Sequence, residues 1–167
     1  LCESHSLEKC IECCLDFTSL NHLARMLGRE KFAVPPESHM FSRSLSQAVN
    51  STTREGDALF NKGKYTDAVE VYTQSAELAT TRLPWENAQI MQEELFTALS
   101  KRTLCYLELH KYIYAMADAE TLISIRRNGI DGHFMKAKAL AELGEYQEAV
   151  DALYVGLAFE PKNAVRF

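Results

Sequence analysis

Apolar residues recur every three to four positions along most of the chain, which is the spacing of one face of an α-helix. No segment alternates between apolar and polar residues as a half-buried strand does, so the pattern predicts an all-α protein. Pro35 and Pro36 break the first connection, and turns at Gly63–Tyr65 and Gly144–Tyr146 separate later helices. The helices predicted in this way cover residues 15–28, 41–62, 66–82, 84–110, 112–127, 131–143 and 146–159.

Three helical hairpins share one layout of small residues. In the clearest copy, Gly132 to Pro161, Ala137 and Ala149 sit where the two helices approach each other most closely. The second-helix alanine of the preceding copy is Ala115, and it lies 34 residues before Ala149. Helix–turn–helix units with this period are typical of the tetratricopeptide repeat. The sequence therefore predicts a right-handed α-solenoid of three repeats over residues 39–167, a class of scaffold that binds other proteins.

The first two repeats lie further apart than this period allows. Ala68 and Ala115 are 47 residues apart, so 13 extra residues fall in an insertion near residues 80–89. Pro84 suits the first turn of a helix, where a missing N–H costs nothing. We therefore expect longer helices on both sides of the insertion, with extra surface for docking.

Residues 1–38 form a separate predicted piece that contains a short helix and a Cys/His-rich start. The sulfur and imidazole side chains are spaced Cys-x2-His-x4-Cys-x2-Cys, at Cys2, His5, Cys10 and Cys13. Four such ligands can close a tetrahedral zinc site, and a metal would compensate for the small core of so short a piece. Two alternatives stay open: free thiols in a reducing compartment, with Cys14 as a competitor, or a redox-active Cys10-x2-Cys13 pair.

Composition and charge exclude several functions. The net charge of −5, with no cluster of basic residues interleaved with aromatics, argues against a nucleic-acid partner. No apolar run approaches the roughly 20 residues that cross a bilayer. Five cysteines without an even framework favour the cytosol. Because the chain has no phosphate-binding glycine loop and no nucleophile and base at a diagnostic spacing, we expect no enzymatic activity.

Many tetratricopeptide domains hold the two carboxylates of a chaperone C-terminus in a clamp of Lys, Asn and Arg side chains. Counted from the turn alanines, the five clamp positions are occupied by Thr53, Asp57, Lys101, Asp131 and Met135. None of them matches the clamp, and Asp57 would repel an acidic tail. Asp131 suits the cap of its helix, while Lys101 and Met135 remain able to contact an extended peptide.

Several segments resemble the cytosolic tetratricopeptide subunit of the fungal endoplasmic-reticulum Sec complex. They are TTRLPWENAQIMQEELFTALSKRTLCYLELHKY and GHFMKAKAL, with HSLEKCIEC and DFTSLN resembling the start of filamentous-fungal members. The resemblance covers essentially the whole chain, and its most specific parts are the Pro84-Trp85-Glu86 insertion and the Ser100-Lys101 pair.

The resemblance implies a non-catalytic receptor subunit for post-translational import, peripheral on the cytosolic face of the endoplasmic reticulum. It also implies a membrane-anchored Sec-complex partner and docking of DnaK-type chaperones. We then expect Phe17, Pro84 and Trp85 to contact the partner, so that membrane association is indirect. The alternative function is a free cytosolic co-chaperone adaptor that binds chaperone C-terminal tails.

Overall fold

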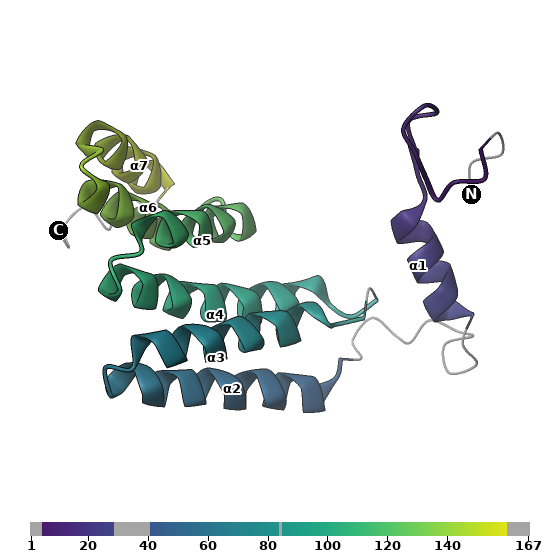
Figure 1. Ribbon diagram of the computed structural model, residues 1–167, viewed down its shortest axis with the longest axis horizontal. Coiled ribbons are helices and arrows are strands. Elements are labelled where there is room, and N and C mark those ends of the chain that lie inside the picture. The colour runs from purple at the N-terminus through teal and green to yellow at the C-terminus, as the bar shows by residue number, and fades with distance from the viewer. Residues whose placement is uncertain (1–4, 29–40, 84, 160–167) are drawn as a thin grey trace. The chain divides into compact units, whose positions relative to one another are not determined.

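A computed structural model describes residues 5–28, 41–83 and 85–159 of the chain. The chain divides into two compact units (Figure 1). The N-terminal unit comprises Leu1–Phe41 together with Leu83–Ala88, and the repeat unit comprises Ser42–Arg82 and Gln89–Phe167. The predicted domain boundary lies between residues 38 and 39, and the short insertion segment groups with the N-terminal unit rather than with the repeats.

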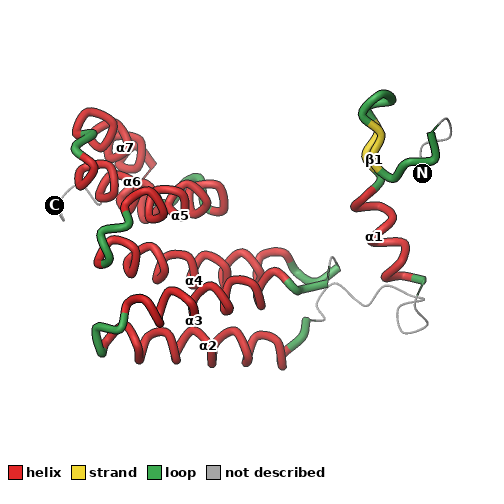
Figure 2. Tube along the Cα trace, viewed as in Figure 1, coloured by secondary structure: helices red, strands yellow, loops and turns green. Residues whose placement is uncertain are grey.

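In its described residues, the N-terminal unit contains a small β-hairpin followed by one helix (Figure 2). Strands β1 (Lys9–Cys10) and β2 (Leu15–Asp16) pair antiparallel, and α1 spans Thr18–Leu27. The expectation of a chain without strands was wrong in this place, because two-residue strands are too short to alternate visibly in a sequence. Cys14 takes a left-handed backbone conformation (φ 52°), which closes the turn between the strands.

The described part of the repeat unit contains six helices, which form three successive hairpins (Figure 1). The middle hairpin has the longest first helix, α4, with 21 residues, whereas α5, α6 and α7 have 14 each. This difference confirms the predicted lengthening beside the insertion, and α3 is longer by two residues. The helices are α2 (Arg43–Asn61), α3 (Tyr65–Thr80), α4 (Ala88–Glu108), α5 (Tyr112–Ile125), α6 (Ile130–Leu143) and α7 (Tyr146–Phe159).

The predicted start of α4 at Pro84 was wrong. Residues 85–87 form a turn and the helix begins at Ala88, while Pro84 itself lies outside the described residues. The Glu86 N–H donates to the Leu83 carbonyl at 2.9 Å, so the backbone turns there before the helix starts. The insertion therefore supplies a turn as well as additional helix.

Each hairpin turns by the same helix-end hydrogen bond. The backbone N–H groups of Lys64, Lys111 and Glu145 donate to carbonyls five residues earlier, at 3.0, 2.8 and 3.0 Å. The left-handed residue that this ending needs is Gly63 in the first turn and Gly144 in the last. The middle turn uses a non-glycine residue in that place, His110, with φ 57°.

Small residues let neighbouring helices approach closely, as the repeat pattern predicts. Ala68 and Ala115 are fully buried, and Ala137 and Ala149 are nearly so. Gly56 on α2 lies against the ring of Tyr72 on α3, where an added Cβ would come within 2.5 Å of a ring carbon. Core clusters join each helix to its sequence neighbours, as in other solenoids.

A buried ion pair fixes the end of the first hairpin beside the insertion. Arg82 follows α3, and its guanidinium donates to both carboxylate oxygens of Glu94 on α4 at 2.7–2.9 Å. It also donates to the Ser46 hydroxyl of α2 at 2.6 Å. The Arg82 and Glu94 side chains are 2% and 11% exposed. Three helices are thus tied together by one cation.

Candidate functional site

A hollow between α2 and α4 lies where the groove of a tetratricopeptide domain is expected. Its volume is about 410 Å³. It is lined by Asp57, Phe60 and Asn61 from α2, Tyr72 from α3, and Lys101 and Leu104 from α4. The lining combines apolar side chains with one acidic and one basic group, so the hollow can bind a peptide that is partly apolar.

Asp57 organises the polar part of this hollow. Its Oδ1 atom accepts a hydrogen bond from the Tyr72 hydroxyl at 2.7 Å and is ion-paired with the Lys101 ammonium at 2.5 Å. Burial raises the pKa of Tyr72 well above its usual range, and the nearby Asp57 carboxylate raises it further, so the phenol stays a donor. The Lys101 charge is therefore matched within the groove by a residue of the protein itself.

The other three predicted groove residues do not line this hollow. Thr53 is only 8% exposed. Its hydroxyl donates to the Val49 carbonyl at 2.8 Å and lies 2.7 Å from the Ser75 hydroxyl, so it belongs to the packing between α2 and α3. Met135 is half-buried and packs against a core cluster that includes Phe96.

Asp131 does not cap its helix, contrary to the sequence-based interpretation. The N-cap of α6 is Gly129, and no side chain makes the capping hydrogen bond. Asp131 is exposed in the first turn, where a negative charge still favours the helix dipole. It lines a separate hollow at the α5–α6 connection, beside Arg126 and Arg127.

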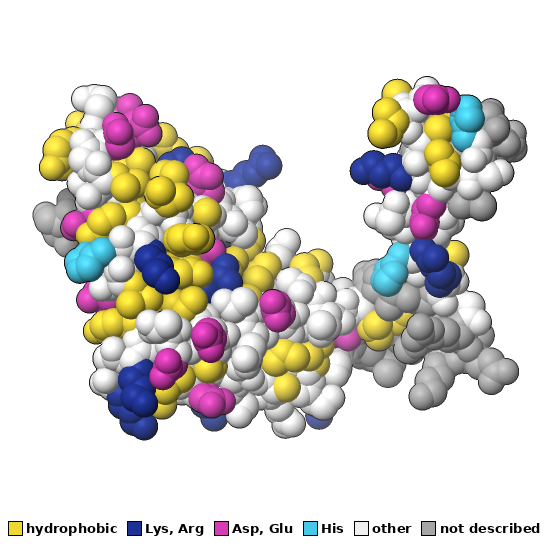
Figure 3. All heavy atoms as spheres, in the orientation of Figure 1, with side chains coloured by type: hydrophobic (Ala, Val, Ile, Leu, Met, Phe, Trp, Pro, Cys, Tyr) yellow, Lys and Arg dark blue, Asp and Glu magenta, His cyan; other side chains and the backbone are white. Residues whose placement is uncertain are grey.

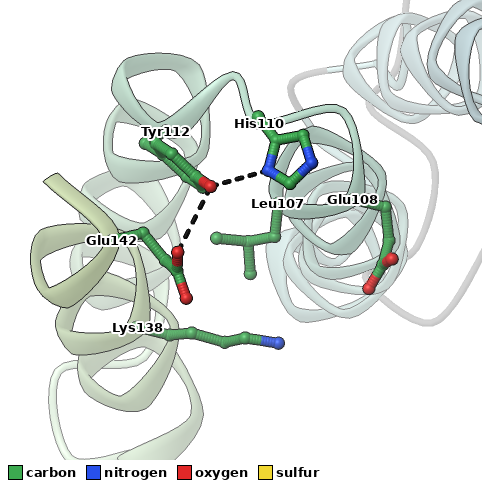
Figure 4. A pocket seen from close by; sticks show the side chains of 6 residues that line it. All are labelled: Leu107, Glu108, His110, Tyr112, Lys138 and Glu142. Carbon is green, nitrogen blue, oxygen red and sulfur yellow. Dashed lines mark hydrogen bonds between the residues drawn. The ribbon is translucent and has the colours of Figure 1, made fainter.

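A second polar hollow, between the α4–α5 turn and α6, was not predicted from the sequence (Figure 4). The Tyr112 hydroxyl lies 2.7 Å from the His110 Nδ1 atom and donates to the Glu142 carboxylate at 3.2 Å. Lys138 reaches into the same space from α6. The group contains no serine or cysteine nucleophile, and its exposed polar atoms suit contact with a polar ligand. The one signal in the sequence is the His-x-Tyr pair at the second turn.

Exposed apolar side chains occur on the later helices of the repeat unit. Apolar surface gathers over the C-terminal helices in Figure 3. Tyr146, Val150 and Tyr154 are exposed at intervals of four residues and so form one stripe along α7. Ile113 and Tyr114 on α5 are also exposed. This exposed surface belongs to the repeat unit and not to the N-terminal unit.

The predicted partner-contact residues fall in one unit. Phe17 is half-buried at the end of the β-hairpin, where its N–H donates to the Glu8 carbonyl at 2.9 Å. Trp85 is half-buried in the insertion segment, which groups with the same N-terminal unit. Pro84 lies outside the described residues. Two segments far apart in the sequence therefore belong to one compact part of the molecule.

The predicted metal ligands His5, Cys10 and Cys13 are brought together by the β-hairpin. Cys2 lies outside the described residues. Cys14, the competing thiol, is exposed, and its sulfur contacts the Ile11 carbonyl at 3.6 Å. No helix in the described parts of the chain is long and apolar enough to span a membrane.

The stacked hairpins and the groove between their first helices define a tetratricopeptide-repeat scaffold. The tetratricopeptide repeat family model matches residues 57–80. The ER protein translocation subcomplex subunit sec67 of Schizosaccharomyces pombe is 30% identical over 142 residues, which cover 83% of this chain and 74% of that protein. The chain belongs to the family of this sec67 subunit.

Solved structures agree with this fold. The Sec complex from S. cerevisiae contains a chain with a TM-score of 0.74 at 23% identity, covering 95% of this chain and 82% of that chain. The second tetratricopeptide domain of Spaghetti (RPAP3), solved with the HSP90 peptide SRMEEVD, has a TM-score of 0.54 at 25% identity. It covers 69% of this chain and 89% of that domain.

Proposed function

We propose that the chain is a non-catalytic scaffold subunit of the machinery for post-translational protein translocation into the endoplasmic reticulum. It acts on the cytosolic face and is peripheral, held there by a membrane-anchored partner subunit. The observation that carries this proposal is the similarity to the sec67 translocation subunit, because it extends over most of both chains rather than over one repeat. A match confined to the repeats would have supported only a generic scaffold.

The surface proposed for the membrane-anchored partner lies on the N-terminal unit. Phe17 and Trp85 are both large aromatic residues, and both belong to this unit although 68 residues separate them in the sequence. Aromatic residues of this size are enriched among the anchors of protein interfaces. The insertion therefore serves the partner contact rather than the peptide groove.

Binding of purified chain to the cytosolic segment of the membrane-anchored subunit tests this surface. We expect Trp85→Ala and Phe17→Ala each to weaken binding by 10-fold or more, about 1.4 kcal/mol or above, as for interface anchors. Tyr154→Ala is the matched control, because it removes an exposed aromatic residue from α7 of the repeat unit. Equal losses in all three variants, or no binding by the unchanged chain, would contradict the proposal.

The groove is proposed to dock a DnaK-type chaperone without the two-carboxylate clamp. Phe60 and Leu104 offer apolar contacts, and Lys101 is the basic group of the described lining. Because Asp57 already pairs with Lys101, the groove favours a chaperone segment with apolar side chains over a strongly acidic tail.

A free co-chaperone adaptor is the second candidate function, favoured by the similarity to the RPAP3 domain bound to an HSP90 peptide. Titration with the peptide SRMEEVD and with its C-terminally amidated form distinguishes this adaptor function from the translocation-subunit function. If the groove binds as proposed, the peptide SRMEEVD should bind weakly, and C-terminal amidation should barely change its affinity. Asp57→Asn keeps an acceptor for Tyr72 and releases the Lys101 charge, so acidic-peptide binding should tighten by roughly 3- to 10-fold. Tight, salt-sensitive binding that amidation abolishes in the unchanged chain would favour the adaptor.

A further inference from the structure

The β-hairpin of the N-terminal unit gathers three side chains that are good ligands for zinc. Cys10 ends β1, Cys13 lies in the turn, and His5 precedes the first strand. The His5 Nδ1 atom lies 3.4 Å from the Sγ atom of each cysteine. All three ligand atoms lie within 4.8 Å of one another. We propose that His5, Cys10 and Cys13 hold a structural zinc ion.

The two nitrogen–sulfur distances are close to those of ligands around one ion. Zinc binds thiolate sulfur at about 2.3 Å and imidazole nitrogen at about 2.0–2.1 Å. At tetrahedral angles these bond lengths place nitrogen and sulfur about 3.6 Å apart. The observed 3.4 Å for both pairs is close to this value. Three protein ligands leave one position for a water or a further residue.

The orientation of the imidazole also suits a metal. The other ring nitrogen of His5, Nε2, lies 3.0 Å from the Glu12 carboxylate. A carboxylate in this position takes the Nε2 proton as a hydrogen bond, so the Nδ1 lone pair faces the two sulfurs. Histidines that bind zinc are commonly held in this way by a carboxylate, which fixes the tautomer and makes the ligand more basic.

The burial pattern of the unit shows why a metal is useful there. Among the residues of the N-terminal unit whose burial the structure describes, Cys10 is the only buried one, at 2% exposure. A unit this small can bury only a limited apolar core, and small domains commonly use a metal as another source of stability. Two thiolates and a neutral imidazole also balance the charge of Zn²⁺, so the buried sulfur carries no uncompensated charge.

The turn separates the two adjacent thiols. Cys14 has a left-handed backbone and an exposed side chain, and its sulfur contacts the Ile11 carbonyl. It therefore does not join the His5, Cys10 and Cys13 group. Cys14→Ser is accordingly a matched control for Cys10→Ser and Cys13→Ser, because it removes a neighbouring thiol by the same change.

Metal analysis of the purified full chain tests the proposal. We expect about one equivalent of zinc after purification without chelators. Co²⁺ added to the metal-free chain should give the intense visible bands of a tetrahedral site with thiolate ligands. His5→Ala, Cys10→Ser and Cys13→Ser should each lose these signals, and Cys14→Ser should keep them. Glu12→Gln should weaken zinc affinity roughly 10- to 100-fold, as loss of such a supporting carboxylate does.

Two results would overturn the proposal. One is less than half an equivalent of zinc together with no tetrahedral Co²⁺ spectrum in the unchanged chain. The other is a metal-free chain whose mass shows that Cys10 and Cys13 have lost two hydrogens, which would identify a redox pair instead. Far-UV circular dichroism of each variant shows whether the repeat helices remain folded, so a lost signal can be assigned to the site.

Discussion

The ion pair between Arg82 and Glu94 gives the sharpest test of how the first two repeats are held together. Glu94→Gln preserves the size of the side chain but removes its charge. The Arg82 guanidinium is 2% exposed and donates three hydrogen bonds to Glu94. After the change, the buried cation keeps the Ser46 hydroxyl and the single oxygen of the new amide.

The expected cost follows from this geometry. Breaking a buried ion pair by removing one partner costs about 3–5 kcal/mol, because the remaining charge stays buried without compensation. Because Arg82 keeps acceptors such as the Ser46 hydroxyl and the amide oxygen, Glu94→Gln should fall at the lower end of this range, about 3 kcal/mol. For a unit of this size, such a loss lowers the melting temperature by roughly 10 °C.

The neighbouring residue provides a matched control. Glu93 pairs with Arg126, but the two side chains are 57% and 37% exposed, and Arg126 also lies over the Phe96 ring at 3.9 Å. Glu93→Gln should therefore cost less than about 1 kcal/mol. Thermal unfolding followed by far-UV circular dichroism measures both variants. Equal shifts for Glu93→Gln and Glu94→Gln would refute the role given to burial.

Three further predictions follow from other contacts. Gly56→Ala should destabilise the repeat unit by about 1–3 kcal/mol in chemical denaturation, because the new methyl group meets the Tyr72 ring. In a chain that already carries Tyr72→Leu, the added Gly56→Ala change should cost much less. Burial raises the pKa of Cys105 to about 11, so the folded state favours the protonated thiol. The free energy of unfolding should therefore fall by roughly 1 kcal/mol per pH unit between about pH 9 and 11. In urea titrations, Cys105→Ala should lack this fall, and the same pH dependence in that variant would contradict the prediction. Chelation of zinc should weaken partner binding, because Phe17 directly follows the β-hairpin that carries the proposed site. Intact partner binding by the metal-free chain would show that the zinc site and the partner surface are independent.

The helical part of the fold could be predicted because its signals are local and repeated. The spacing of Ala115 and Ala149 fixes the period, and Gly63 and Gly144 mark two turns. The α7 bounds, Tyr146–Phe159, are those predicted. The β-hairpin was missed because its register depends on a turn made by Cys14, a residue with no turn preference of its own.

The site was less accessible from sequence, because its groups meet across repeats. Asp57 and Lys101 are 44 residues apart, and their pairing depends on how α2 and α4 stack. Thr53 was placed in the groove by counting, but Ser75 on α3 draws its hydroxyl into the packing. The gathering of His5, Cys10 and Cys13 was predictable, since ligand spacing within one short loop is a local property.

Native purification of the tagged chain from detergent-solubilised membranes tests the central claim most directly. We expect translocon subunits to co-purify, with the membrane-anchored partner recovered in near one-to-one ratio. Trp85→Ala should reduce this recovery, whereas Tyr154→Ala should not. Recovery of the chain from the soluble fraction with chaperones, and without any translocon subunit, would contradict the proposed function.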